Sequence, residues 1–428
     1  MSTEDRMPRL AAGDCLLAIA ITVAVAAFHY LHGQQLAGSV LLKSFNWVFD
    51  FDSSRFLGGW CTPQVDVANY FGLSFVARHA LSLALRPPCL GLTWLLGDPA
   101  LALMALTAIC AGLTALLTFL FAAQFCAAAI DRLILALGFS VSAQPLLLGV
   151  IPETFGFALA GIAFHLSLVA RRLDAPKATR RSSMVSLAIN AGVTVTNAVL
   201  NVVSSAVIAW QRMPPRRWLA QEVRSWLLAG VLLALVIVPL AALFIPRILA
   251  DSANAPKAVW WIININRGEA AGLAQVLASF ILYGFVAPEL TTVYLPAPDS
   301  HDMLDFRALR YGPWGMAALG AWAAAMLWSV RLVWHDSASR RLLAIIALWL
   351  VLNIALHWFW QYRGSVFLYG AHTAFPLFAV LVMGYAAAMR KYAATAVRCF
   401  ALATITLAAV NNLGPYQTVI DFLLRQPV

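Results

Sequence analysis

Two carboxylates that stand one residue apart have the clearest capacity for chemistry in this chain. Asp50 and Asp52 lie among aromatic side chains, soon after the first long apolar segment, and Arg55 follows Asp52 by three residues. Such a pair can hold a divalent cation over a phosphate, or one carboxylate can act as a general base on a hydroxyl group while the other orients a partner. The alternative is a solvated acidic pair with Arg55 as a surface counter-ion, which contributes little stability.

Glu153 is the next acidic candidate. The chain contains five glutamates, and this one follows Pro152 between two apolar segments. We expect it at the outer end of two membrane spans, where it lines the same chamber as the acidic pair of the first loop. Alternatively, it caps the helix that starts after it and complements the dipole of that helix, a role that is compatible with the first.

Basic and aromatic side chains offer contacts to a phosphate. An Arg363 and a His372 that face outward at the membrane surface would bind a lipid-linked phosphate, with Tyr369 stacked on the lipid or the sugar. Alternatively, these residues form an interfacial aromatic belt with a snorkelling Arg363. Three basic side chains of the first loop offer headgroup contact or phosphate binding: Arg78, His79 and Arg86.

The composition indicates which elements must position these groups. Hydrophobic residues make up 62% of the chain and charged residues 11%, and the mean hydropathy is +0.79. Separated apolar runs of about 20 residues are typical of membrane-spanning helices, whereas the strands of a membrane barrel alternate in polarity. We therefore expect an all-α polytopic membrane protein with about 9–11 transmembrane helices.

The apolar runs also give a topology. Spans are expected near residues 11–31, 99–122, 133–150, 155–170, 225–244, 314–334, 342–360, 373–389 and 399–410. The first run is expected to be retained, with a cytoplasmic N-terminus. Residues 33–97 then form the first extracytoplasmic loop, with interfacial helices on either side of Pro87-Pro88, and residues 246–313 form the second extracytoplasmic segment. All belong to a single integral membrane domain, residues 1–428.

Two basic loops, residues 171–183 and 212–224, are expected in the cytoplasm because positive charge favours that side. The net charge of +10 is therefore interpreted as topology and not as nucleic-acid binding. For both loops to face the cytoplasm, the segment 184–210 between them must be broken or re-entrant. In that segment Asn190, Asn197 and Asn201 share one helix face, where they either hold helices together or line a polar cavity.

The cysteine spacing and the absence of nucleotide-binding motifs limit the kinds of site that the sequence supports. The six cysteines have no metal-ligand spacing; Cys61 and Cys89 share the first loop and would be able to pair if it faces an oxidising compartment. The sequence contains neither a GxxxxGK[ST] phosphate loop nor a Rossmann glycine pattern. We therefore expect a substrate that the membrane delivers, at the extracytoplasmic face.

In order and form, these features resemble the GT-C class of polytopic glycosyltransferases, which take a sugar from a polyprenyl-phosphate donor on the outer leaflet. Asp50-Phe51-Asp52 matches the modified Asp-x-Asp motif that the class carries in its first outer loop, and Glu153 matches a second carboxylate outside spans three and four. The chain lacks the large C-terminal soluble domain of some members, which leaves the acceptor open. The resemblance implies transfer to a glycolipid, polysaccharide or other acceptor, in cell-envelope glycan synthesis at a bacterial inner membrane.

The resemblance also implies roles for the candidate residues. Asp50 or Asp52 would be the base and Glu153 the second carboxylate, and a divalent cation, if one is used, would sit on the first pair. The implied substrate contacts are Arg55, Arg78, His79, Asn197, Arg363, Tyr369 and His372, of which Arg78, Arg363 and His372 would hold the phosphate. Partners would be the donor, the acceptor and membrane lipids, and no nucleic acid.

Two other classes remain open from the sequence. A secondary transporter or lipid flippase would explain the broken segment 184–210, although such proteins typically show internal repeats that this chain lacks. A ligase or acyltransferase acting on an outer-leaflet glycolipid would use His79 or His372 together with arginines.

Overall fold

A computed structural model describes residues 11–44, 46–49, 51–62, 80–174, 180–210, 214–242, 272–295, 301–359 and 365–427. Within these ranges seven helices are long and apolar enough to cross a membrane: α1 (Ala12–Leu36), α6 (Pro99–Ala122), α9 (Thr154–Asp174), α16 (Pro313–Trp334), α17 (Ser337–Phe359), α19 (Ala371–Lys391) and α20 (Ala394–Arg425). The expected class, a polytopic helical membrane protein, is confirmed. In addition, α12 (Pro215–Ala242) covers most of the span expected at 225–244.

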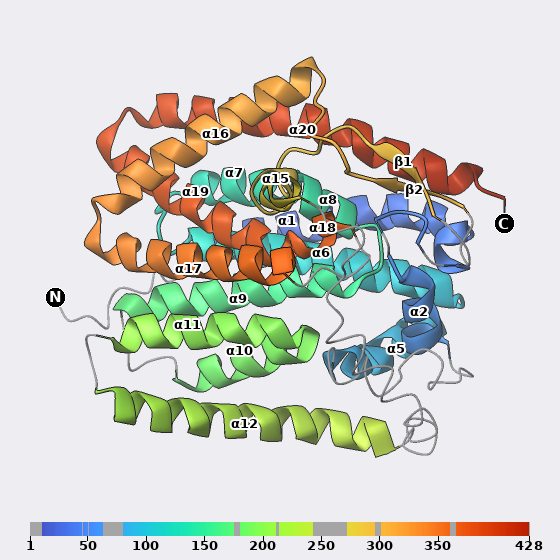
Figure 1. Cartoon of the computed structure of the whole chain (residues 1–428), viewed down its shortest axis with the longest axis horizontal. Coiled ribbons are helices and arrows are strands. Elements are labelled where there is room, and N and C mark those ends of the chain that lie inside the picture. The colour runs from blue at the N-terminus through green and yellow to red at the C-terminus, as the bar shows by residue number, and fades with distance from the viewer. Residues whose placement is uncertain are drawn as a thin grey trace.

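Burial separates central helices from peripheral ones. The apolar stretch of α19 is 83% buried, that of α9 72% and that of α6 61%, whereas the stretches of α1 and α20 are 17% and 6% buried. Helices α6, α9 and α19 thus form the centre of the bundle, and α16 and α20 cover one side of it while α10, α11 and α12 cover the other (Figure 1). The exposed apolar faces of the outer helices suit a lipid surrounding.

Two apolar segments are broken, one that was expected to be and one that was expected as a single span. The segment 184–210 forms α10 (Arg180–Val193), the short 3₁₀ helix η5 (Val195–Asn197) and α11 (Ala198–Ala209), and it folds back on itself as a hairpin, as expected (Figure 1). The segment 133–150, expected as one helix, is instead α7 (Ala129–Ser140) followed by α8 (Ala143–Leu148). The reason is that Pro145 cannot donate a hydrogen bond to the Val141 carbonyl. That carbonyl accepts from Asn412 of α20 at 2.9 Å.

Short elements gather at one end of the bundle, at the right of Figure 1. They are 3₁₀ helix η2 (Val40–Leu42), α2 (Ser53–Phe56), π-helix η3 (Leu57–Cys61), 3₁₀ helix η4 (Ala80–Leu85), α5 (Arg86–Leu96) and the strands β1 (Thr291–Tyr294) and β2 (Asp302–Asp305). The strands pair antiparallel, with Thr291 opposite Asp305. Pro87-Pro88 stands in the first turn of α5, so the expected break before this helix is present.

Nearer the centre of Figure 1 lie α15 (Leu273–Ala278), which continues into the π-helix η7 (Ser279–Tyr283), and α18 (Val366–Tyr369), which precedes α19. The first loop, the turn between α8 and α9, the β-hairpin and α18 supply the residues of the site.

Candidate functional site

The loop after α1 is anchored to the β-hairpin by backbone hydrogen bonds. The Leu304 N–H of β2 donates to the Trp47 carbonyl at 3.1 Å, and the Phe49 N–H donates to the Leu304 carbonyl at 2.9 Å, so that Val48 pairs with Leu304 in parallel. Phe49 is buried and has a φ of 50°, a region that side chains other than glycine rarely adopt. Packing therefore holds this turn in a strained conformation and fixes the direction in which the chain reaches Asp52.

This loop places Asp52 against Glu153, although the two are 101 residues apart in the chain. The Asp52 N–H donates to Glu153 Oε2 at 3.2 Å. Next to it, the Ser53 hydroxyl donates to the Pro152 carbonyl at 2.9 Å. The Asp52 carboxylate pairs with Arg55 at 2.8 Å, and these two side chains are 35% and 31% exposed. A half-exposed ion pair and a buried carboxyl group thus share one site.

Glu153 is buried, at 7% exposure, at the start of α9. Its Oε1 accepts from the Thr154 N–H at 2.8 Å and the Thr154 hydroxyl at 3.1 Å. Burial, and next the negative charge of Asp52, raise the pKa of Glu153 to about 8, against the opposing effect of the hydrogen bonds from Thr154 and from the Asp52 N–H. At neutral pH most Glu153 side chains are therefore protonated. The side chain thus caps the start of α9 and also contacts the loop that carries Asp52. Its role as the second carboxylate of an active site stays a prediction.

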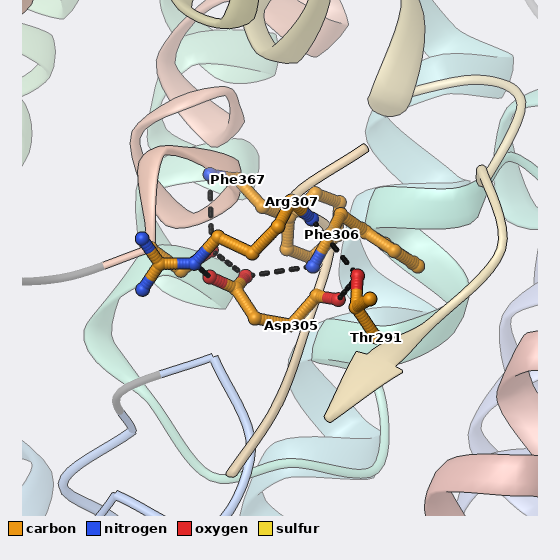
Figure 2. Close-up of polar contacts among 6 residues, drawn as sticks. Thr291, Asp305, Phe306, Arg307 and Phe367 are labelled. Carbon is orange, nitrogen blue, oxygen red and sulfur yellow. Dashed lines mark hydrogen bonds and ion pairs between the residues drawn. The ribbon is translucent and has the colours of Figure 1, made fainter. Parts of the chain in front are cut away.

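A second carboxylate cluster lies on the β-hairpin (Figure 2). Asp305 is 1% exposed. Its Oδ1 accepts from the Phe306 N–H at 2.8 Å and the Ser365 hydroxyl at 2.5 Å, and its Oδ2 pairs with Arg307 Nε at 2.5 Å. Burial raises the pKa of Asp305, although Arg307 and the hydrogen bonds act against this. Both terminal nitrogens of Arg307 point away from the carboxylate (Figure 2), so this guanidinium is oriented with donors left for an anion.

No local pattern in the sequence marks Arg307 or Ser365. Arg307 follows β2 among other charged residues, and Ser365 is the N-cap of α18, to whose hydroxyl the Phe367 N–H donates at 3.3 Å. Both side chains bind Asp305, and Ser365 is 60 positions away from Asp305 in the chain. Only a structure reveals it.

Tyr369 and His372 belong to a cluster of stacked rings. The Tyr369 ring stacks on His357 with ring centroids 4.2 Å apart, and the rings of His357 and His372 are parallel within 5° at 6.2 Å. Phe155, two residues after Glu153, contacts both Tyr369 and His372 edge-on. His372 is 1% exposed and lies inside the protein, at the start of α19. It would meet only a ligand that enters the protein, and its expected phosphate contact stays a prediction.

The asparagines of the α10–α11 hairpin divide into two roles. Asn190 donates to Asn201 at 2.9 Å across the hairpin, and His165 of α9 bonds through both ring nitrogens to serines of α10 and α11 at 2.8 and 3.0 Å. Interhelical packing therefore accounts for Asn190 and Asn201. Asn197 is fully buried at the break, and neither polar atom of its side chain has a hydrogen-bond partner among the described residues. The expected shared helix face is wrong, because the chain breaks between Val193 and Ala198.

Four predicted site residues lie outside the described ranges: Asp50, Arg78, His79 and Arg363. Their roles stay predictions. Arg86 is described and buried, and it donates to the carbonyls of Gly59 at 2.5 Å and Thr62 at 3.0 Å. The expectation that Arg86 contacts lipid headgroups is therefore wrong; it holds the end of the first part of the loop against α5.

A disulfide reinforces that contact. Cys61 and Cys89 are bonded, with Cα atoms 4.9 Å apart, and the Thr93 hydroxyl donates to the Cys61 carbonyl at 3.0 Å. The bond ties η3 to α5 across 28 residues. The pairing left open by the sequence is thus present.

No three His, Cys, Asp or Glu side chains gather as metal ligands within the described part of the chain. The expected cation pair includes Asp50, which lies outside that part. The cation at Asp50 and Asp52 therefore stays a prediction.

Comparison with models of known protein families gives no match, and comparison with curated protein sequences gives none either. The functional argument consequently depends on the geometry around Glu153.

Proposed function

We propose that this protein is a membrane glycosyltransferase that moves a sugar from a polyprenyl-phosphate donor to a hydroxyl group of a glycolipid, polysaccharide or other acceptor. The observation that carries the proposal is the hydrogen bond from the Asp52 N–H to Glu153 Oε2. It joins two scarce acidic residues of distant segments at one end of a helical bundle that offers few other charges. Acidic residues with different environments at one site are typical of acid–base chemistry.

In the proposed reaction, the Asp52 carboxylate accepts the proton of the acceptor hydroxyl. The hydroxyl oxygen forms a bond to the anomeric carbon of the donor while the bond from that carbon to the phosphate oxygen breaks, and its electron pair leaves on the phosphate. Protonated Glu153 donates a hydrogen bond to a substrate oxygen and adds no second negative charge beside the departing phosphate. Arg307 supplies donors for the phosphate, together with Arg363 if its expected role holds.

The disulfide supports an extracytoplasmic site. Disulfides persist in oxidising compartments and are rare in the cytosol, and Cys61–Cys89 lies in the same loop as Asp52. The basic loops 171–183 and 212–224 independently favour the opposite face for the cytoplasm. A lipid-linked donor on the outer leaflet would then reach Asp52 without crossing the protein.

The test uses the full chain in phospholipid vesicles. The vesicles receive undecaprenyl phosphate linked to each of several radiolabelled hexoses and a glycolipid extract as acceptor, and release of undecaprenyl phosphate is measured. We expect donor-dependent release, reduced at least about 100-fold in Asp52→Asn, whereas Asp421→Asn at the partly exposed end of α20 keeps the wild-type rate. Full transfer by a folded Asp50→Asn/Asp52→Asn double variant would contradict the assignment of the base.

A transporter or flippase is the second candidate, favoured by the α10–α11 hairpin with its buried Asn197. Such a protein would move an intact lipid-linked sugar between leaflets. Protection of the labelled donor from an external hydrolase, with no release of polyprenyl phosphate, would support transport over transfer.

A further inference from the structure

A small cavity with a mostly apolar lining and a few polar side chains lies beside Glu153, between α1, α6, α7–α8 and α9. Glu153 and His29 line it, together with Thr107 and Ser140. About 20 Å³ of it is open to the centre of a water molecule, and about 10–15 Å³ on this measure is enough to hold one. The cavity is thus large enough for one water and has polar groups for it to bind.

His29 packs against a glycine that leaves space for its ring. A side chain at Gly149 would place its Cβ only 2.4 Å from His29 Nδ1 and Cε1, so the imidazole lies directly on the glycine backbone. His29 is 2% exposed. Neither of its ring nitrogens hydrogen-bonds to any of the described residues. A buried imidazole in such a position normally has a partner, and water in the cavity is the available one.

Glu153 also needs a hydrogen-bond partner. With its pKa raised to about 8, the carboxyl group is largely protonated at neutral pH, and its O–H needs an acceptor. The Asp52 and Thr154 N–H groups that contact it are donors only. The Thr154 hydroxyl, 3.1 Å from Oε1, is the other group in reach that can accept.

We propose that a water molecule in this cavity bridges the Glu153 carboxyl group and the His29 imidazole, and that His29 is a positioning residue that keeps Glu153 hydrated and able to exchange its proton. The inference concerns Glu153 itself and holds whether or not the substrate is a lipid-linked sugar. His29 has no contact with the reacting atoms in this arrangement. Its action is through the water.

The other titratable or charged groups around Glu153 come from three elements. They are Asp52 and Arg55 of the first loop, Cys110 of α6, which lines the same cavity, and His372 of α19, which lies behind Phe155. Replacing His29 leaves all of them in place. A change in the titration of Glu153 would therefore report the water and its partner.

The test is an infrared titration of the purified full chain in lipid nanodiscs, with no substrate present. The carbonyl band of protonated Glu153 is assigned as the band lost in Glu153→Gln, and its midpoint is followed with pH. We expect a midpoint near pH 8 in the wild type. In His29→Leu the cavity loses the partner of the water, the ionised carboxylate loses solvation, and the midpoint rises by about one pH unit.

Two further variants separate hydration from packing. His29→Gln keeps an acceptor and a donor in the cavity and is expected to titrate within about half a unit of the wild type. Thr154→Val removes the competing acceptor and leaves the effect of His29→Leu intact when the two are combined. An unchanged midpoint in folded His29→Leu, or equal shifts in His29→Leu and His29→Gln, would overturn the proposal. Because no sugar transfer is measured, failure of the proposed function would leave this result standing.

Discussion

Glu153 makes a measurable contribution to how stability depends on pH. In the folded protein its pKa is raised from 4.5 to about 8, chiefly by burial. The folded state therefore binds a proton that the unfolded state releases at any pH between these values. The contribution of Glu153 to the free energy of unfolding is fully present below pH 4.5. It decreases as the pH rises from there and is lost once the pH has passed about 8.

The magnitude follows from the size of the shift. A rise from 4.5 to about 8 corresponds to about 5 kcal/mol of unfolding free energy lost at high pH. The part lost between pH 6 and pH 9 is about 3 kcal/mol. Glu153→Gln carries no ionisable group at this position, so the variant lacks this part of the pH dependence.

The assay compares the thermal unfolding midpoints of the wild type and Glu153→Gln in the same detergent from pH 6 to pH 9. We expect the midpoint of the wild type to fall relative to that of the variant as the pH rises. Asp421→Asn removes a partly exposed carboxylate of α20 and is expected to follow the wild type. Parallel curves for the wild type and Glu153→Gln over the whole range would refute the raised pKa and the reasoning built on it.

Three further perturbations test the framework around the site by thermal unfolding. Asn412 bonds the Val141 and Phe285 carbonyls and the Ala287 N–H. Asn412→Leu removes the bonds to the Val141 carbonyl and the Ala287 N–H, while the Phe285 carbonyl keeps the Ala143 N–H, and is expected to cost about 2–3 kcal/mol. Gly149→Ala pushes a Cβ into the imidazole that packs on this glycine and is expected to cost about 1–3 kcal/mol. Breaking the disulfide by Cys61→Ser frees a loop of 28 residues and is expected to cost about 3–4 kcal/mol.

Each of these has a matched control elsewhere in the chain. Thr404→Val removes a polar group that bonds only within its own helix, Gly320→Ala adds a Cβ with no atom within 4 Å, and Cys399→Ser changes an exposed free thiol. These controls are expected to stay within about 1 kcal/mol of the wild type. A control that loses as much as its partner would show that the site-specific contact is not the cause.

The sequence predicts the parts of the fold that depend on local chemistry. Apolar length defines the long helices, because a lipid environment forces the backbone to satisfy its own hydrogen bonds. Pro87-Pro88 predicts the start of α5, and the charge of the two flanking loops predicts the break in 184–210. In each case the residues that decide the outcome are neighbours in the chain.

The parts that could not be predicted depend on distant partners. Pro145 is a local signal for the α7–α8 break, but the partners that satisfy the break are distant: Asn412, and the carbonyls of residues 284 and 285, to which α8 donates its first N–H groups. The attachment of the first loop needs Leu304. No periodicity or spacing near residue 48 or residue 141 carries information about these contacts.

The site residues also divide into those that the local sequence marks and those that only distant contacts bring together. Asp52 and Glu153 stand out because carboxylates are scarce in an apolar chain, and that scarcity is a local property. Their contact, and the cluster of Asp305 with Arg307 and Ser365, required the folded chain. For His29 the sequence did hold a signal: an ionisable side chain inside an apolar span is a candidate functional residue by default.

The way in which Asp52 reaches Glu153 makes the proposed base unusually easy to test. The contact uses the Asp52 main-chain N–H and not its carboxylate, and the turn before it is fixed by the backbone pairing of Phe49 with Leu304. Asp52→Asn therefore removes a charge while the link between the two segments stays. A loss of transfer in that variant reports the Asp52 carboxylate, together with its ion pair to Arg55 and its effect on the pKa of Glu153. A substitution at Glu153 would in addition change the acceptor of that link.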